Sequence, residues 1–169
     1  ACILSGAGAV ASAAPTAGAT PGDPRLAQVR TWAFAIGAGT LNGDLGSRYA
    51  DFDLVVVDGE EVSRAQVRVL HASGALVLGY LDVGTIERGR GWFARAKPYR
   101  LDFWPEWGEW YAKVAAPGYR RLLTEHVAPE MLRKSLDGLF LDNVDMIETH
   151  PAQVHGMRVL VGALSREVH

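Results

Sequence analysis

The stretch Asp53-Leu54-Val55-Val56-Val57-Asp58-Gly59 holds an unbroken aliphatic run between two aspartates. β-Branched residues favour strands, and a continuous apolar run is typical of a strand that is buried on both faces. Strands of parallel sheets are buried in this way because helices cover both sides of the sheet. We therefore expect residues 53–59 to form a central strand of a parallel sheet.

The rest of the chain alternates between similar apolar runs and segments with helical periodicity. Further strands are expected at residues 32–37, 76–81 and 138–141, and helices at residues 60–73, 119–136 and around 154–164. Ser63 and Gln66 stand at the spacing of a capping box near the start of the first helix. Residues 91–118 are rich in aromatic residues and prolines and are expected to be irregular. The order βαβαβαβα predicts an α/β fold with a parallel sheet and about four βα units.

Composition excludes several classes of protein. Hydrophobic residues make up 49% of the 169 residues and charged residues 21%, which excludes a disordered chain. The net charge of −2 gives no basic footprint for nucleic acid. A single cysteine, Cys2, excludes a disulfide framework and a cysteine-rich zinc site. The five histidines form no metal-binding motif, so no metal site is predicted.

The first 22 residues carry no charged side chain and are built mostly from small residues. Residues 1–14 are too short for a membrane span, which takes about 20 apolar residues. They are typical of the apolar part of a secretory signal peptide, with Ala11-Ser12-Ala13 as a cleavage site. We expect an exported protein, with a disordered linker up to residue 22 and the domain from residue 23 to 169. An Ala-rich tail and a lipid anchor on Cys2 are the alternatives.

Three predicted strands run directly into an aspartate, at Asp58, Asp82 and Asp142. Because the carboxyl ends of parallel strands gather on one face of an α/β fold, these side chains are expected to share one mouth. A buried carboxylate is costly unless it is paired or solvated, so repeated acids at strand ends indicate a site. The alternative is that Asp58 and Asp82 only cap the segments that follow.

Three indoles fall in the segment 102–113, at Trp104, Trp107 and Trp110. Indole faces beside an acidic mouth suit a sugar, since the rings offer flat apolar area and a polar N–H. A small aromatic cluster that seals one end of the core is an equally good interpretation.

A third pattern, Gly37-x-Gly39-x-x-x-Gly43 after the first strand, resembles a dinucleotide-binding fingerprint, but its third glycine is one position late.

Four segments together carry a family resemblance. They are Asp53-Leu54-Val55-Val56-Val57-Asp58, Gly79-Tyr80-Leu81-Asp82-Val83-Gly84-Thr85-Ile86-Glu87, Trp104-Pro105-Glu106-Trp107-Gly108-Glu109-Trp110 and Asp137-Gly138-Leu139-Phe140-Leu141-Asp142-Asn143-Val144-Asp145. From about Trp32 onward the chain resembles the endo-α-1,4-polygalactosaminidases, glycoside hydrolase family 114. It departs from the family pattern at Asp82, where Ser is frequent, and at Thr85, where Glu is frequent, so Glu87 is the acid retained in that motif.

The resemblance implies a (β/α)8 barrel, usually secreted, that cleaves galactosamine-containing polysaccharide without a cofactor. By motif match Asp142 is the catalytic aspartate, and the matching glutamate lies on a later strand beyond His169. The residues expected to bind substrate are Asp58, Tyr80, Asp82, Glu87, Trp104, Trp110, Asn143 and Asp145. The other functions left open are a non-catalytic sugar-binding protein and a nucleotide-binding α/β protein that uses the Gly37 region.

A (β/α)8 barrel takes about 250 residues, which is more than this chain contains. Four βα units therefore correspond to the first half of a barrel. We expect a partial TIM barrel with an open four-stranded parallel sheet, unpaired edges, and one member of the carboxylate pair.

Overall fold

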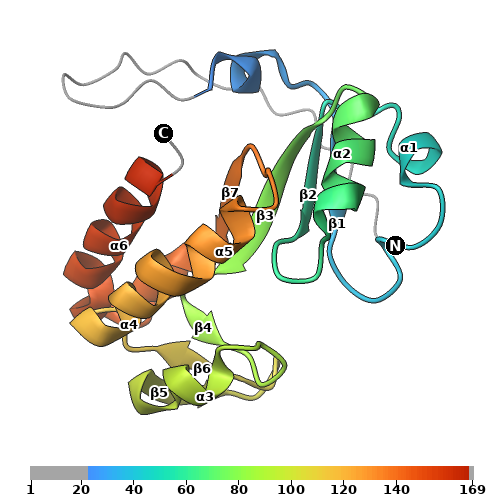
Figure 1. The fold of residues 1–169 in the computed structure, drawn as a ribbon. Coiled ribbons are helices and arrows are strands. Elements are labelled where there is room, and N and C mark those ends of the chain that lie inside the picture. Colours follow the sequence, from blue (N-terminus) through green and yellow to red (C-terminus); the bar gives the residue numbers. More distant parts are fainter. Residues whose placement is uncertain (1–22, 168–169) are drawn as a thin grey trace.

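A four-stranded parallel sheet forms the centre of the structure, a computed structural model that describes residues 23–167 (Figure 1). The strand order is β1-β2-β3-β7, and each neighbouring pair is parallel. The strands are β1 (Trp32–Ala35), β2 (Leu54–Asp58), β3 (Leu76–Asp82) and β7 (Gly138–Asp142). The predicted α/β fold and the parallel sheet are confirmed. The predicted leader and linker of residues 1–22 lie outside the described residues.

The sheet is open, and within residues 23–167 neither β1 nor β7 has a strand partner on its outer side. It is also strongly curved, because Phe34 on one edge strand and Phe140 on the other meet with ring centroids 5.0 Å apart. Trp32 and Phe34 on this concave face remain 41% and 38% exposed. In a closed barrel the same face is the filled interior, so the chain forms a partial TIM barrel, as predicted.

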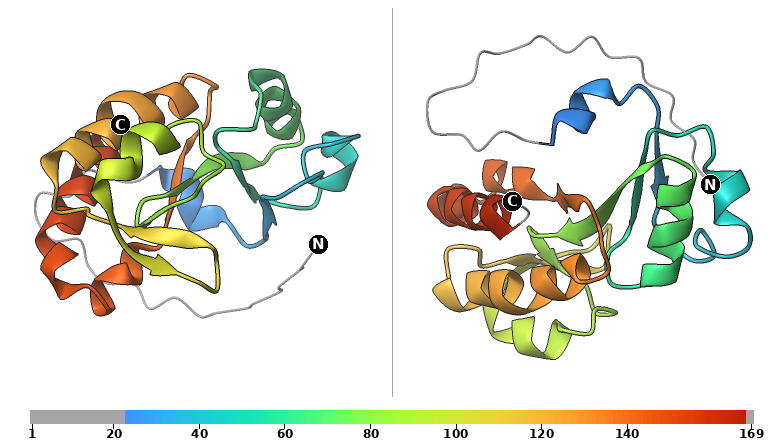
Figure 2. Two further views of the ribbon diagram at one scale, coloured as in Figure 1. Left: turned by 90° about the horizontal axis from the view of Figure 1, so that it is seen from below. Right: turned by 45° about the horizontal axis from the view of Figure 1, so that its top comes forward.

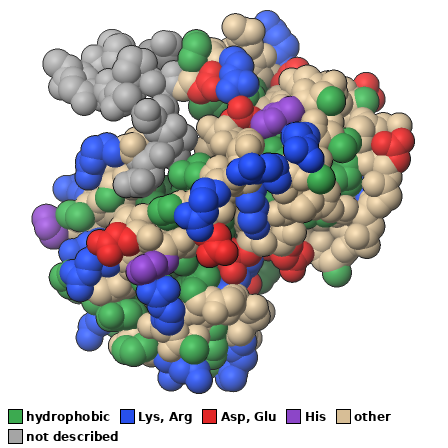
Figure 3. Space-filling model, viewed as in Figure 1, with side chains coloured by type: hydrophobic (Ala, Val, Ile, Leu, Met, Phe, Trp, Pro, Cys, Tyr) green, Lys and Arg blue, Asp and Glu red, His purple; other side chains and the backbone are tan. Residues whose placement is uncertain are grey.

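Helices cover the opposite face of the sheet and bury its larger core. Val55 and Val57 of β2 and Val77 of β3 are fully buried in this core. The helix α2 (Arg64–Ala72) begins with the predicted capping box, in which the side chains of Ser63 and Gln66 each accept a hydrogen bond from the other residue's backbone N–H. The other helices on this side are α1 (Leu45–Arg48), α4 (Pro117–Leu122), α5 (Ala128–Leu132) and α6 (Val154–Glu167). On the face seen in Figure 3, basic and acidic side chains lie next to one another.

The helix predicted at residues 119–136 runs from Pro117 to Leu132 through α4 and α5, ends four residues earlier than predicted, and contains a π-helical turn at Leu123–Val127. Pro129 follows this turn in the first positions of α5. Proline lacks the N–H that bonds the preceding turn and crowds its carbonyl, and a wider turn relieves both problems. The predicted interruption near Pro129 is thus a π turn inside the helix.

Residues 91–118 are more regular than predicted, and this expectation was wrong. They contain the helix α3 (Phe93–Ala96), a 3-10 turn (Lys97–Tyr99) and the hairpin strands β5 (Arg100–Trp104) and β6 (Glu109–Ala112). Gly108 adopts a φ of 71° at the reversal, which side chains with a Cβ disfavour. The hairpin pairs with β4 (Thr85–Ile86) in the order β4-β6-β5, and Figure 1 shows this second sheet beyond the carboxyl end of β3.

The hairpin and α3 therefore flank one end of the parallel sheet, as the two further views in Figure 2 also show. The remaining elements are 3-10 turns at Pro24–Gln28, Val144–Glu148 and Pro151–Gln153. Throughout residues 23–167, every helix is too short or too polar to cross a membrane.

Candidate active site at the strand ends

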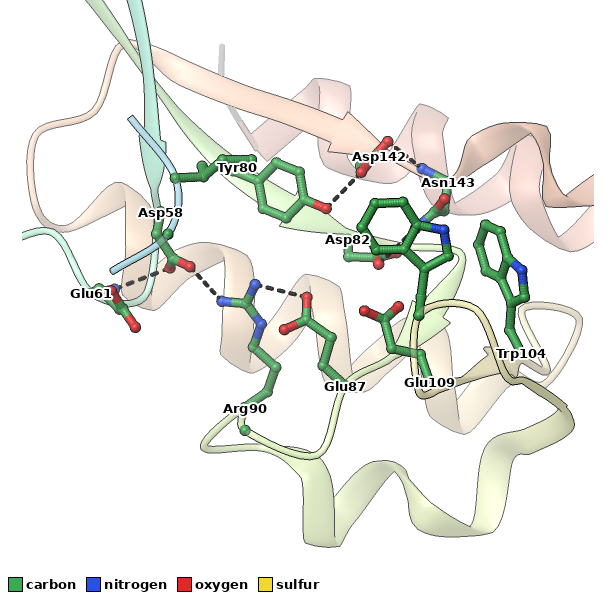
Figure 4. A pocket seen from close by; sticks show the side chains of 14 residues that line it. Asp58, Glu61, Tyr80, Asp82, Glu87, Arg90, Trp104, Glu109, Asp142 and Asn143 are labelled. Atoms are coloured by element: carbon green, nitrogen blue, oxygen red, sulfur yellow. Dashed lines mark hydrogen bonds and ion pairs between the residues drawn. The ribbon is translucent and has the colours of Figure 1, made fainter. Parts of the chain in front are cut away.

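The three strand-end aspartates meet at one mouth, as the sequence predicts. Asp58, Asp82 and Asp142 are the last residues of β2, β3 and β7, and Asp82 stands directly opposite Asp142 in the strand register. They line a cavity of about 690 Å³, shown in Figure 4. Its lining is completed by Ile36, Gly37, Glu61, Tyr80, Glu87, Gly89, Arg90, Trp104, Trp107, Glu109 and Asn143.

Two of the nine predicted site residues do not line this cavity. Glu109 points into the cavity (Figure 4). Its neighbour in β6, Trp110, lies on the other face of the strand, because strand side chains alternate between faces. The Trp110 ring instead packs at 5.0 Å from Phe103 and lies under the guanidinium of Arg100. Asp145 lies in the 3-10 turn after β7 and is exposed.

Asp142 is held by one donor on each carboxylate oxygen. The Tyr80 hydroxyl donates to Oδ2 at 2.6 Å, and the Asn143 backbone N–H donates to Oδ1 at 2.8 Å. Asn143 can do so because its backbone is left-handed, with a φ of 55°, a conformation that Asn tolerates better than most residues. Burial, together with this hydrogen bond, raises the pKa of Tyr80, so the phenol keeps its proton and acts as a donor. The carboxylate of Asp142 is thereby fixed in orientation at the mouth.

Asp82 is 4% exposed and accepts hydrogen bonds from two sides. Its Oδ1 accepts the N–H groups of Gly84 and Thr85 at 3.0 and 2.9 Å, which is the capping role that we considered as the alternative. Its Oδ2 contacts the Thr85 hydroxyl and accepts the Asn143 side-chain N–H at 2.8 Å. Burial raises the pKa of Asp82 against these hydrogen bonds. The residue therefore both caps a turn and belongs to the site.

Asp58 combines the same two roles through a different partner. Its Oδ1 accepts the N–H groups of Glu60 and Glu61, and its Oδ2 pairs with Arg90 at 2.8 Å. The other end of the guanidinium pairs with Glu87, also at 2.8 Å. Burial opposes the charge on Arg90, but the hydrogen bonds to Glu87 and Asp58 outweigh it and hold the pKa of the guanidinium above its ordinary value. Arg90 thus connects two predicted site residues.

Glu109 is a site residue that sequence reasoning missed. Its Oε2 contacts the Thr85 hydroxyl, and its carboxyl lies beside Asp82 and Glu87 (Figure 4). Burial raises the pKa of Glu109, and repulsion from these two acids adds to the effect. The segment around Gly108 could have indicated a hairpin, which would have placed Glu109 and Trp110 on opposite faces. Nothing in the sequence pattern marks Arg90 or Glu61, which the topology alone brings to the cavity.

The cavity is strongly acidic and carries aromatic walls. Six carboxyl groups line it, and Arg90 is the one basic side chain among the lining residues. Trp107 is 70% exposed, and its ring centroid lies 6.2 Å from that of Trp104. Trp104 is in turn stacked on Tyr111 at 5.0 Å. An opening of this kind suits a ligand with flat apolar faces and cationic or hydroxyl groups.

The glycine motif does not form a phosphate site in the described chain. The three glycines at 37, 39 and 43 all have positive φ values and shape a turn. The helix after them, α1, has four residues, and its N-terminus is already capped by the Asp44 carboxylate. An anion would meet that negative charge, which argues against the nucleotide-binding alternative. Within residues 23–167, no group of three or more His, Cys, Asp or Glu side chains is arranged to hold a metal ion.

Comparisons with known proteins agree with this geometry. The model of the glycoside-hydrolase family GH114 matches residues 9–163. The glycoside hydrolase domain of PelA from Pseudomonas aeruginosa superposes with a TM-score of 0.69 at 22% identity, over 82% of this chain and 56% of that domain. Ega3 from Aspergillus fumigatus, solved in complex with galactosamine, gives 0.65 at 18% identity, over 82% and 55%. The chain thus spans a little over half the length of these structures, and no curated protein matches its sequence.

Proposed function

The chain belongs to glycoside-hydrolase family GH114, and we propose that the protein hydrolyses an α-1,4-linked, galactosamine-containing polysaccharide at the acidic cavity. The observation that carries this proposal is the position of Asp142. It ends β7 at the carboxyl edge of the sheet, lines the cavity, and is oriented by Tyr80 and Asn143. Catalytic groups of (β/α)8 enzymes occupy this edge.

Glycoside hydrolysis uses two carboxyl groups, one that protonates the leaving oxygen and one that acts as nucleophile or activates water. The two carboxyls stand about 5 Å apart in retaining enzymes and about 6.5–9.5 Å apart in inverting ones. Asp142 accepts one hydrogen bond on each oxygen, from Tyr80 and from Asn143, so both oxygens act as acceptors, which suits the carboxylate member of the pair. Its partner is proposed to lie on a later strand, beyond His169.

The charge of the cavity supports an amino-sugar substrate. A polymer with free amines is cationic, and the six carboxyl groups of the lining would attract it. Trp104 and Trp107 at the rim offer flat faces for sugar rings. Ega3, which shares the fold, was solved with galactosamine bound. Asp58 and Glu87 are tied to Arg90, so we assign them to orienting sugar groups rather than to the chemistry.

The experiment is to incubate the full-length protein with a galactosamine polymer and with its fully N-acetylated form, and to measure released oligosaccharides. Release from the free-amine polymer supports the proposal. Binding of the polymer without release would identify a non-catalytic sugar-binding protein instead. If the polymer is neither bound nor cleaved, the assignment of this cavity to amino sugars is refuted.

We also propose that the protein acts outside the cell, on the basis of the predicted leader in residues 1–22. Detection of the protein in the culture medium, cleaved after Ala13, would support this location. Retention in the cell with an intact N-terminus would contradict it.

A further inference from the structure

The Thr85 hydroxyl lies between two carboxyl groups. Its oxygen contacts Asp82 Oδ2 on one side and Glu109 Oε2 on the other. A hydroxyl has one proton, so it can donate to only one of these oxygens. The other contact is a hydrogen bond only if that carboxyl carries a proton and donates it to Thr85. For both contacts to be hydrogen bonds, one of the two carboxyl groups must therefore be protonated.

The donors around each carboxyl decide where this proton resides. Asp82 accepts three N–H groups, from the backbones of Gly84 and Thr85 and from the side chain of Asn143. Hydrogen bonds to a carboxylate stabilise its charged form. Within residues 23–167, the contact with Thr85 is the one hydrogen bond that the Glu109 carboxyl makes. Burial opposes the charge on Asp82 as well, but its three N–H donors compensate this cost, and Glu109 has no such donors. We therefore place the charge on Asp82 and the proton on Glu109.

We infer that Glu109, Thr85 and Asp82 form a hydrogen-bonded relay in which Glu109 holds a proton in the ligand-free site, and that the binding of a cationic amino sugar releases this proton. In the free site Glu109 Oε2–H donates to Thr85, and Thr85 donates to Asp82. When an ammonium group binds, the Glu109 carboxyl ionises and its proton passes to the buffer, so charge and proton balance. Only the choice of an amino sugar as ligand rests on the proposed function.

The surroundings of Glu109 support the relay. Its acidic neighbours are Asp82 at the end of β3 and Glu87 after β4, and both disfavour a further negative charge. Arg90 acts in the opposite direction, but its guanidinium is already paired with Asp58 and Glu87. Burial is the largest effect and raises the pKa of Glu109, whereas a hydrogen bond donated by Thr85 would lower it. In the relay Thr85 donates to Asp82 instead, so this opposing effect is absent. A bound cation would stabilise the ionised carboxylate of Glu109, so Glu109 would release its proton.

The relay also gives the site a way to tell amines from acetamides. A neutral N-acetyl group offers no charge to stabilise an ionised Glu109, so it would bind without releasing the proton. Asn143 joins the relay to Asp142, because its side chain donates to Asp82 and its backbone N–H donates to Asp142. Glu109 is therefore a specificity-determining residue that faces the ligand, and the chemistry remains with Asp142.

Two measurements test the inference. The first is an NMR titration of glutamate carboxyl groups in the protein without ligand, with Glu109 assigned from the Glu109→Gln variant. We expect Glu109 to titrate above the other glutamates. If Glu109→Gln does not fold, Glu109→Asp removes the same resonance while keeping a carboxyl. Titration of Glu109 with the exposed glutamates, such as Glu106, would overturn the relay whether or not any sugar binds.

The second measurement is calorimetric binding of a galactosamine oligomer at about pH 6, where primary amines are charged, in buffers with different ionisation enthalpies. We expect a release of up to about one proton per bound oligomer, which Glu109→Gln abolishes and the exposed control Glu106→Gln leaves unchanged. An N-acetylated oligomer should release none. Equal proton release in wild type and Glu109→Gln would refute the role of Glu109. If the oligomer does not bind, the amino-sugar link is refuted, while the ligand-free titration still decides the relay.

Discussion

Replacing Arg90 with Met removes the positive centre that holds two acidic residues at the mouth. Arg90 is 13% exposed at its side chain and pairs at 2.8 Å with Asp58 and at 2.8 Å with Glu87, whose side chains are 10% and 27% exposed. Removing one partner of a buried ion pair costs about 3–5 kcal/mol because it leaves an uncompensated buried charge. Asp58 keeps its two backbone donors and Glu87 is partly solvated, so we expect a loss of about 3 kcal/mol, at the lower end.

Urea unfolding followed by circular dichroism measures this loss. With a denaturant slope of about 1–3 kcal/mol per molar urea, the midpoint should fall by roughly 1–3 M. The matched control is Arg88→Met, since Arg88 is exposed and its guanidinium lies 4.5 Å from the Trp110 ring. Such a contact is worth about 0.5–1 kcal/mol at an exposed site. The double variant Arg90→Met/Asp58→Asn should recover part of the loss. If Arg90→Met is as stable as Arg88→Met, the ion pairs do not hold the mouth together.

Two further substitutions probe the ends of the strands. A Cβ on Gly84 would lie 1.9 Å from the Asn143 carbonyl oxygen, so Gly84→Ala should lower the unfolding free energy by about 1–3 kcal/mol. The control is Gly89→Ala, whose Cβ would meet nothing within 4 Å and which should cost less than about 0.5 kcal/mol. Equal urea midpoints for the two variants would contradict the close approach at Gly84. Burial opposes the charge of Asp137, but hydrogen bonds from Val77 and two basic side chains outweigh it and hold its pKa below the ordinary value. The ionised Asp137 therefore stabilises the native state at pH values above the pKa that the group has in the unfolded chain. This stabilisation is lost as the pH falls through the lower pKa that the group has in the folded protein. Asp137→Asn should cost about 1–3 kcal/mol at pH 7 and less in acid, and a cost independent of pH would contradict this.

The strands and the meeting of their acidic ends were predictable from the sequence. Aliphatic runs that end in Asp58, Asp82 and Asp142 encode both the buried strands and the shared edge, because a parallel sheet brings carboxyl ends together. The capping box at Ser63 was equally readable, since it depends on residues three apart. These features are local, or they follow from the topology of the fold.

The rest of the site depends on tertiary contacts that the sequence does not mark. The hairpin of β5 and β6 was predicted as an irregular segment, because its prolines and clustered aromatics obscure the alternation of a strand. That error hid Glu109 and left Trp110 among the expected substrate contacts. Arg90 reaches Asp58 across 32 positions of sequence, a distance that no local pattern encodes.

Asp142→Asn in the full-length protein tests most directly whether Asp142 performs the chemistry of an amino-sugar hydrolase, as we propose. The exposed Asp51→Asn serves as the control, because Asp51 lies in the turn before β2, at the opposite end of the strand from Asp58. Removal of a catalytic carboxylate from a galactosamine-polymer hydrolase should lower the rate of oligosaccharide release by at least about 100-fold, with the polymer still bound. Near-wild-type release by Asp142→Asn would contradict the account.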